Sequence, residues 1–562
     1  MISPKIVQEH YAAHKKYWDE KRPELRKLRA AYMCRYWDKA HTPDQILIET
    51  SRAYEFIEGY VASLFARSPA VVVKGDLRGK GDAAKVQALV NNYLSGVRNQ
   101  LEDSTRLGLI YPCSFLKLVP NDHPDPFRRV SIAAVAPWDV LVDTDAHSWG
   151  AQKFVAHRYY VTLNEAKKKY GNKKFAPHPL IRFLDMVSEA RDKGYGGEDK
   201  ASEDPHFQYV EIVEFYDLAD DRLVIWSPDY KNGDKFVYDG IVMPEGAEGE
   251  IKEKRYNAIP FKDSANHPIA PIVPLYYSRQ PDIPLRGYSS LRRVYDQVQE
   301  HNIIRSYQAS MVRKAARQWV VESGVFDSEA MAKLTQGVDG EFIEVELSPG
   351  QQLAGSIMAV PHTPVPHELQ QYALEVQNDF ERGSILAPFT RGESTRATAT
   401  EITALAAYSS SEVGRLARER DSTIEGIASI YIAMMKLYLA DEGDVMVLSG
   451  EATIVNADDL TGDFTYYAQD SGATPVSEAI KKQEFMAALP TLVSMGVPPD
   501  KILEEIVRFL DLPHSFLEHL ESAPMSPQPP ATTAAEAGMQ SSGGLAPGQN
   551  PSPEDIAQFL PQ

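Results

Sequence analysis

Residues 284–319 read PLRGYSSLRRVYDQVQEHNIIRSYQASMVRKAARQW. They open the stretch from Pro284 to Asp441, whose order of helices and insert is the main evidence for the predicted architecture. Apolar side chains recur here at helical spacing, which predicts an amphipathic helix with a net charge of +5. The apolar positions are Leu291, Val294, Tyr295, Val298, Ile304, Tyr307 and Met311. Residues 320–362 reverse the charge to −6 and predict a compact insert of a strand, a short helix and a second strand.

A returning helix and one very long helix follow the insert. The first is predicted over 366–386 and is followed by a loop that Pro388 and Gly392 mark. From Ile402, alternating steps of three and four residues visit eleven positions, and only Ser409 and Arg420 are neither apolar nor tyrosine. A helix over 398–441 would be about 66 Å long, and we expect it to rest on several layers or on neighbouring subunits.

The remaining sequence predicts an α+β, mainly helical chain. Residues 5–70 are expected to be helical with a break near Pro43, and 83–104 to form another helix. Between 109 and 277 the pattern favours strands, with a helix after Thr162 as its N-cap. The expected strands include 71–73, 115–119, 130–132, 140–142, 154–161, 209–217, 223–226, 236–238, 445–448 and 452–455. Two helices are predicted over 475–494 and 499–510, and the proline-rich residues from 522 onward predict a disordered tail.

Composition narrows the function classes. The 562-residue chain has a formal net charge of −19, so tight phosphate binding by the whole surface is not expected. Two cysteines, Cys34 and Cys113, argue against a disulfide framework or a cysteine-built zinc site. We expect synthesis in a reducing cytoplasm, no membrane association, no cofactor and no enzymatic activity, since neither a phosphate-binding loop nor a common hydrolase motif is present.

One stretch offers potential metal ligands. Asp139, Asp143, Asp145 and His147 alternate along a segment that is predicted to be extended, and hard side chains on one face suit a cation. The favoured alternative is a polar turn that ends a strand, because acidic residues are common in turns.

Charged side chains suggest two further surfaces. The acidic residues of the insert predict a docking surface for a basic partner: Glu322, Asp327, Glu329, Glu341, Glu344 and Glu346. For the last three, a solvated strand edge is the other interpretation, and a catalytic pair of carboxylates is the less favoured one. The basic residues of the first helix could contact phosphates or pair with Glu368, Glu375, Asp379 and Glu381 of the returning helix, within one chain or across a subunit boundary. They are Arg292, Arg293, Arg305, Arg313, Lys314 and Arg317. Arg391 and Arg396, in the loop before the long helix, are better placed for a transient contact with DNA, and a role at the helix start or in a subunit interface is an equal alternative.

The order of these elements, together with several local strings, resembles the portal (head-to-tail connector) proteins of tailed bacteriophages. The resemblance covers roughly residues 1–520 and depends on the strings together, since no single one is diagnostic. They are DSTRLGLIYP at 103–112, PWDVLVD at 137–143, AHRYYVT at 156–162, PLRGYS at 284–289 and ATATEI at 397–402.

The resemblance implies an assignment of parts. By position they are an N-terminal helical part of the wing at 1–108, a β-rich wing at 109–286, a first stem helix at 287–318, a clip at 319–362, a second stem helix at 363–386, a tunnel loop at 387–397, a long wing helix with a β patch at 398–474, a helical crown at 475–521 and the tail at 522–562.

The same resemblance implies a function. The family forms dodecameric rings at one capsid vertex of the virion, where it nucleates head assembly and lets double-stranded DNA pass non-specifically. Its implied partners are the large terminase subunit, head-completion and tail adaptor proteins, and the major capsid and scaffolding proteins. Two alternatives remain: another virion assembly protein, such as a scaffold or tail hub, and a metal-dependent nucleic-acid enzyme that uses the Asp139–His147 stretch.

Overall fold

The structure is a computed structural model, and it divides the chain into two compact units, Met1–Ile480 and Lys481–Gln562. All residues described below belong to the first unit. They are 2–37, 46–66, 68–75, 81–171, 173–179, 208–232, 235–245, 252–263, 265–280, 286–315, 319–321, 327–336, 357–359, 366–384, 399–439, 444–448 and 451–469. The predicted helices at 475–494 and 499–510 and the predicted tail lie outside this set.

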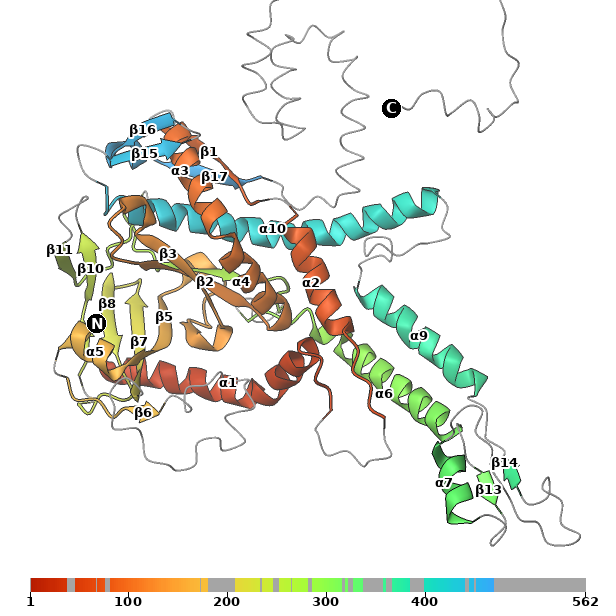
Figure 1. Cartoon of the computed structure of the whole chain (residues 1–562). Coiled ribbons are helices and arrows are strands. Elements are labelled where there is room, and N and C mark those ends of the chain that lie inside the picture. The colour runs from red at the N-terminus through yellow and green to blue at the C-terminus, as the bar shows by residue number, and fades with distance from the viewer. Residues whose placement is uncertain are drawn as a thin grey trace, which may run out of the picture. The chain divides into compact units, whose positions relative to one another are not determined.

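Four helices precede the first large sheet (Figure 1). They are α1 (Pro4–Tyr32), α2 (Arg52–Leu64), α3 (Ala83–Gly96) and α4 (Arg98–Ile110). Ser3 caps α1 and Asp82 caps α3, each by accepting backbone N–H groups of the first turn. The prediction of one helix over 83–104 was wrong. The chain breaks at Val97, whose N–H turns back to the Leu94 carbonyl, and α4 then starts afresh.

Two antiparallel sheets form the β-rich part. The three-stranded sheet has the order β12-β2-β3, with β2 (Ser114–Pro120), β3 (Val130–Val135) and β12 (Ile272–Leu275). The six-stranded sheet has the order β4-β5-β7-β8-β9, with β6 beside β7. Its strands are β4 (Val140–Val142), β5 (Phe154–Thr162), β6 (His178–Pro179), β7 (Gln208–Asp217), β8 (Arg222–Trp226) and β9 (Tyr238–Asp239).

The local predictions in this region are mostly confirmed. Helix α5 (Leu163–Tyr170) begins after Thr162, whose hydroxyl accepts from Glu165 N–H while the Glu165 carboxylate accepts from Thr162 N–H. The strand expected at 236–238 was misplaced, because pairing with β8 begins only at Tyr238. Short 3-10 helices lie at Pro126–Arg128, Pro137–Asp139, Trp149–Ala151 and Asp458–Leu460.

Three two-stranded ladders complete this part of the chain. Strand β1 (Val71–Gly75) pairs with β17 (Phe464–Ala468), although almost four hundred residues separate them along the sequence. The other pairs are β10 (Ile241–Glu245) with β11 (Lys252–Tyr256), and β15 (Asp444–Leu448) with β16 (Glu451–Val455). Strands β10, β11 and β17 were not predicted.

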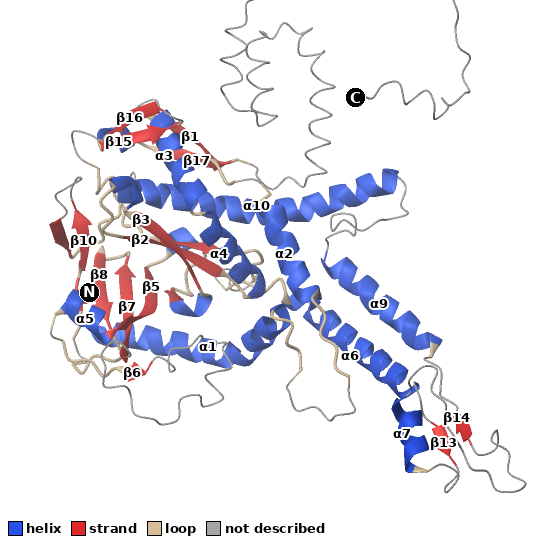
Figure 2. Ribbon diagram, viewed as in Figure 1, coloured by secondary structure: helices blue, strands red, loops and turns tan. Residues whose placement is uncertain are grey.

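The decisive stretch forms helices, as predicted (Figure 2). Its described elements are α6 (Arg292–Ala315), β13 (Trp319–Val321), α7 (Ser328–Gln336), β14 (Ile357–Ala359), α9 (His367–Ser384) and α10 (Ala399–Met435). The 37 residues of α10 span about 55 Å, six residues short of the predicted end. The strand predicted at 341–345 lies outside the described residues.

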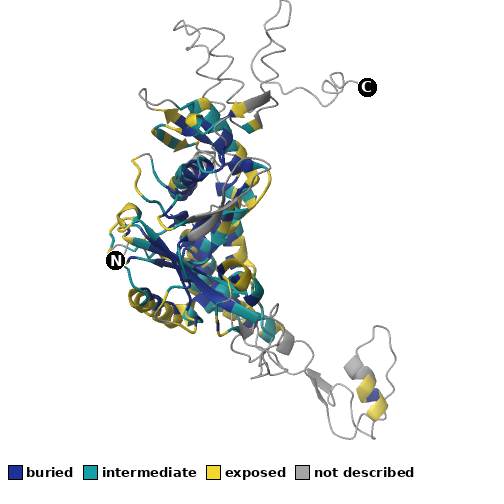
Figure 3. Cartoon of the chain, turned by 90° about the vertical axis from the view of Figure 1, so that its left-hand side faces the viewer, coloured by how far each residue is buried: buried dark blue, intermediate teal, exposed yellow. Residues whose placement is uncertain are grey.

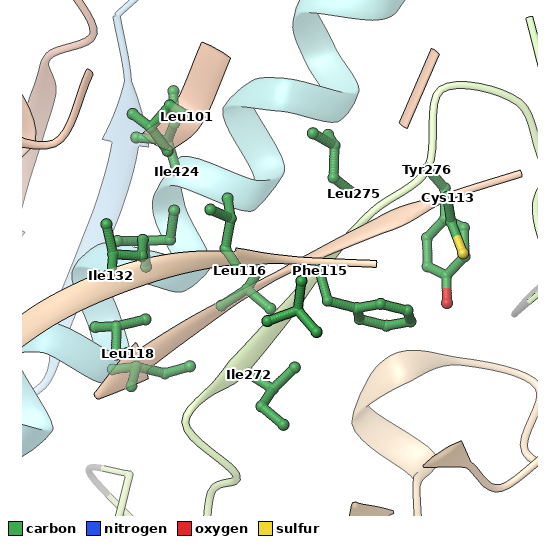
Figure 4. Packing of buried hydrophobic residues seen from close by; sticks show 14 of the residues in the cluster. Leu101, Cys113, Phe115, Leu116, Leu118, Ile132, Ile272, Leu275, Tyr276 and Ile424 are labelled. Carbon is green, nitrogen blue, oxygen red and sulfur yellow. The ribbon is translucent and has the colours of Figure 1, made fainter. Parts of the chain in front are cut away.

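The largest core joins the three-stranded sheet to helices on both sides of it in sequence. Figure 4 shows Leu116 of β2 and Ile132 of β3 packed with Leu101 of α4 and Ile424 of α10. Figure 3 shows buried residues concentrated in the sheets and in the helices packed on them. Arg420, an exception on the predicted apolar stripe, is nevertheless buried, where it donates to the Leu64 carbonyl and to Asp421. The fold class is α+β.

Within the described part of the chain, no helix combines the length and the hydropathy needed to cross a membrane.

Candidate interaction surface on the paired helices

Helices α6 and α9 form an antiparallel pair, which we call the helix pair. Strand β13 follows α6 and β14 precedes α9, and these two strands pair antiparallel, so the chain leaves and returns at the same end. The two helices then run side by side (Figure 1). Four apolar side chains on their facing sides are buried: Val294, Val298, Val376 and Phe380.

The N-terminal end of α6 is anchored by close backbone packing. A Cβ atom on Gly287 would lie 1.8 Å from the Pro112 carbonyl oxygen, so only glycine fits there. Ser289 Oγ donates to the Ile110 carbonyl at 2.7 Å, and Leu291 N–H donates to the Leu109 carbonyl. The Gly287–Ser289 string therefore fixes α6 to the end of α4.

Helix α6 carries an exposed apolar ridge that the helix pair does not cover. Ile303, Tyr307 and Met311 recur every fourth residue and are 36%, 63% and 38% exposed, and the neighbouring Val312 is 60% exposed. Tyr307 lies nine residues from buried Val298, which at about 100° per residue places it on the opposite side of the helix. The predicted stripe is thus buried at Val294, Val298 and Ile304 and exposed further along the helix, at Tyr307 and Met311.

Helix α9 carries a second exposed apolar position on its own outer side. Leu374 is 60% exposed and lies two residues before buried Val376, about 200° around the helix. Tyr372 is 45% exposed, and its hydroxyl donates to the Glu300 carboxylate of α6. The helix pair therefore presents two different apolar faces, the α6 ridge at Ile303, Tyr307 and Met311, and the α9 face at Leu374.

The basic residues of α6 have partners away from α9. Arg292 pairs with Asp296 at 2.9 Å, and Arg293 pairs with Glu412 of α10 at 3.4 Å. Arg305 donates to Gln308. The Arg415 guanidinium, and secondarily Arg293, lowers the pKa of the Glu412 carboxyl. These three arginines thus contact residues of α6 and α10 instead of the acidic residues of the returning helix.

Several predicted site residues lie outside the described residues. These are Arg317, Glu322, Glu341, Glu344, Glu346, Arg391 and Arg396. Arg313 and Lys314 lie on the described backbone of α6, and their side chains are outside the description. Of the predicted acidic surface, Asp327 and Glu329 are exposed, and Asp327 Oδ1 caps α7 by accepting Ala330 N–H at 2.7 Å.

The Asp139–His147 stretch forms a polar turn. Asp139 pairs with Arg158 at 2.9 Å, and Asp143 Oδ1 accepts Asp145 N–H directly after β4 ends at Val142. Among the residues that the structure describes, His, Cys, Asp and Glu side chains nowhere gather in a group of three that could hold a metal. The contacts of Asp139 and Asp143 are those expected of the polar-turn alternative.

Sequence reasoning missed a polar stripe on α6. Asn302, Ser306 and Ser310 recur every fourth residue, and their side chains accept backbone N–H groups of residues 46–50. The signal was visible as three small polar residues at helical spacing beside an apolar stripe. The contact was not predicted, because a polar stripe on a helix usually faces solvent.

Similarity to known proteins is found in structure and not in sequence. No protein-family model and no curated protein matches the chain. One similar solved chain comes from the virion of a native gene transfer agent particle, with 11% identity and a TM-score of 0.38. That match covers 80% of this chain and 89% of the other. At this distance the function has to be argued from the residues of the chain itself.

Proposed function

We propose that this chain is the subunit of a ring-shaped channel in a virion, acting as the portal through which DNA is packaged and ejected. The observation that carries the proposal is the helix pair with two unlike apolar faces, on α6 and on α9. A surface that repeats the same patch favours two-fold dimers, whereas two different complementary patches favour head-to-tail contacts that close into a ring.

The exposed residues are of the type that subunit contacts use. Tyrosine and methionine are enriched in the buried centres of interfaces, and Tyr307 and Met311 both lie on the α6 ridge. Contiguous exposed apolar side chains of this kind are uncommon on a monomer without a partner. A neighbouring helix pair offers Leu374 as the complementary apolar contact.

The charge distribution supports DNA passage without tight binding. The net charge of −19 disfavours strong phosphate contacts, and the ion pairs of Arg292 and Arg293 reduce the free positive charge at the start of α6. By the same resemblance that suggests the portal, the proposed partners are the large terminase subunit, tail adaptors, and capsid and scaffolding proteins. The proposed location is a single capsid vertex, and the proposed ring order is twelve.

Mixing two variants tests the head-to-tail contact. Tyr307→Asp disables the α6 ridge and Leu374→Asp disables the α9 face, so each variant alone should remain monomeric. An equimolar mixture should form dimers and nothing larger, because only one pairing of intact faces remains. Native mass spectrometry and negative-stain microscopy of the wild type, which should show rings with a central hole, provide the readout.

A control variant tests whether an added surface charge alone prevents ring formation. Ile6 of α1 is 41% exposed, and Ile6→Asp also replaces an exposed apolar side chain by a carboxylate. It should still form rings. Dimers of Leu374→Asp alone would show a two-fold contact instead, and a wild type that stays monomeric at high concentration would overturn the ring. Rings without a central hole would favour a scaffold or tail hub.

A further inference from the structure

An extended segment just before α2 is hydrogen-bonded along α6, and we call residues 46–50 the strap. Ile46 N–H donates to Ser310 Oγ at 3.4 Å, Ile48 N–H to Ser306 Oγ at 2.9 Å, and Thr50 N–H to Asn302 Oδ1 at 3.1 Å. The Thr50 hydroxyl adds a second bond to Asn302 Oδ1 at 2.7 Å. The strap runs antiparallel to the helix.

The spacing of the two partners explains why the three bonds form together. Four residues of α-helix rise about 6 Å, and two residues of extended chain rise about 6.6 Å. Every second N–H of the strap therefore meets every fourth side chain of α6. Such a ladder requires acceptors four residues apart, which positions 302, 306 and 310 supply. The three side chains are short, so the backbone of the strap can lie close to the helix.

The strap is also held from its other side. The Trp37 indole N–H donates to the Ile48 carbonyl at 3.1 Å, and the Glu49 carboxylate accepts the N–H groups of Tyr36 and Trp37. The strap leads directly into α2, where the Tyr60 hydroxyl donates to the Ser384 carbonyl at the end of α9. One continuous segment thus holds both members of the helix pair.

The attachment to α6 depends on hydrogen bonds more than on apolar burial. Ile46, Leu47 and Ile48 are each only partly buried, whereas Asn302 is 0% and Ser306 6% exposed. The Asn302 Nδ2 group is buried without a hydrogen-bond partner. A buried donor without a partner is destabilising, and this offsets part of what the ladder contributes.

We infer that the strap is a releasable clasp that fixes α6 in its position against α2. A hydrogen bond contributes little net stability, so a ladder of this size is weaker than the core and opens independently of global unfolding. Opening detaches residues 46–50 from α6, whose packing against α9 remains. This device is independent of the proposed ring.

Hydrogen–deuterium exchange of the full-length protein tests the clasp. In the wild type, peptides covering 46–51 should exchange more slowly than an unprotected loop. In the double variant Asn302→Ala/Ser306→Ala, exchange of 46–51 and of 303–312 should both rise at least tenfold. Peptides of the α10 core at 424–435 should be unchanged, which shows that the variant is folded.

Two further variants make the result decisive. Ser306→Thr keeps the hydroxyl and should keep the wild-type protection of the strap. Gln299→Ala alters an exposed residue of the same helix outside the ladder and should have no effect on the strap. Fast wild-type exchange of 46–51 would overturn the clasp. So would release of the strap without faster exchange in 303–312, because the strap would then not be what fixes α6.

Discussion

The sheet region and the helix pair differ in how completely their side chains are buried and paired within one chain. In the sheets, even charged side chains are buried with partners: Lys117 and Glu214 are 5% and 4% exposed and lie 2.5 Å apart. In the helix pair, Tyr307 and Leu374 are 63% and 60% exposed, although both are apolar or aromatic. The sheet region is complete within one chain, whereas the helix pair has the composition of a surface that another molecule covers.

Breaking the buried ion pair should give the largest loss of stability. Lys117 donates to Glu214, and against the opposing effect of burial the lysine lowers the pKa of that carboxyl well below its usual range. Burial also lowers the pKa of Lys117 itself. Lys117→Met removes the closest counter-charge of this buried carboxylate, leaving Lys169 at 4.0 Å, and should cost about 3 kcal/mol of unfolding free energy. Urea denaturation of the wild type and the variant measures this loss.

The matched control removes both charges. In Lys117→Met/Glu214→Gln the new amide still accepts from the Tyr159 hydroxyl, which donates to Glu214 at 2.7 Å. The double variant should recover most of the lost stability, because it leaves no unpaired charge in the buried site. A single variant as stable as the wild type would show that the sheet region does not depend on this pair.

The junction between the two regions should give the next largest effect. A Cβ on Gly287 meets the Pro112 carbonyl, so Gly287→Ala should cost about 1–3 kcal/mol through backbone displacement. A Cβ on Gly96 would have no neighbouring atom within 4 Å, so Gly96→Ala should be neutral or slightly stabilising. Thermal unfolding of the two variants compares them, and equal melting temperatures would contradict the close packing at Gly287.

Acid should weaken the sheet region through His14. Its Nε2 lies 2.9 Å from the Trp138 carbonyl oxygen, and burial lowers the pKa of His14 to about 3. The unfolded chain titrates near pH 6.5, so below that pH it binds one proton more than the folded chain does. Stability is therefore fully present above pH 6.5 and is lost toward pH 3, by up to about 1.4 kcal/mol per pH unit.

The variant His14→Gln tests that sign. Glutamine keeps a donor for the Trp138 carbonyl and does not titrate, so its stability should fall less between pH 7 and pH 5 than that of the wild type. Burial also lowers the pKa of His301 on α6, to about 4, so this residue adds a loss of the same sign and a residual slope is expected. Identical slopes for variant and wild type would remove His14 as the cause.

The sequence predicted local structure well where one element determines its own pattern. The Thr162 cap, strands β4, β5, β7 and β8 and the long α10 helix follow from residue spacing alone. It failed at β17, which forms because the distant strand β1 offers an edge, and at Val97, where a local turn interrupts the predicted helix. The exposure of Tyr307 and Met311 was not predicted, because helical spacing identifies an apolar side chain but not what covers it.

The smallest effect on stability should come from the α6 ridge, because its side chains are exposed. Tyr307→Ser replaces an exposed side chain, so the unfolding free energy of the monomer should change by no more than about 0.5 kcal/mol. Phe380→Ala, on the buried side of the same helix pair, should cost about 3 kcal/mol, because it removes a packed ring and leaves a cavity. Chemical denaturation at low protein concentration measures both. A loss at Tyr307 as large as that at Phe380 would mean that the ridge is folded against its own chain, and the helix pair would then be as complete as the sheets.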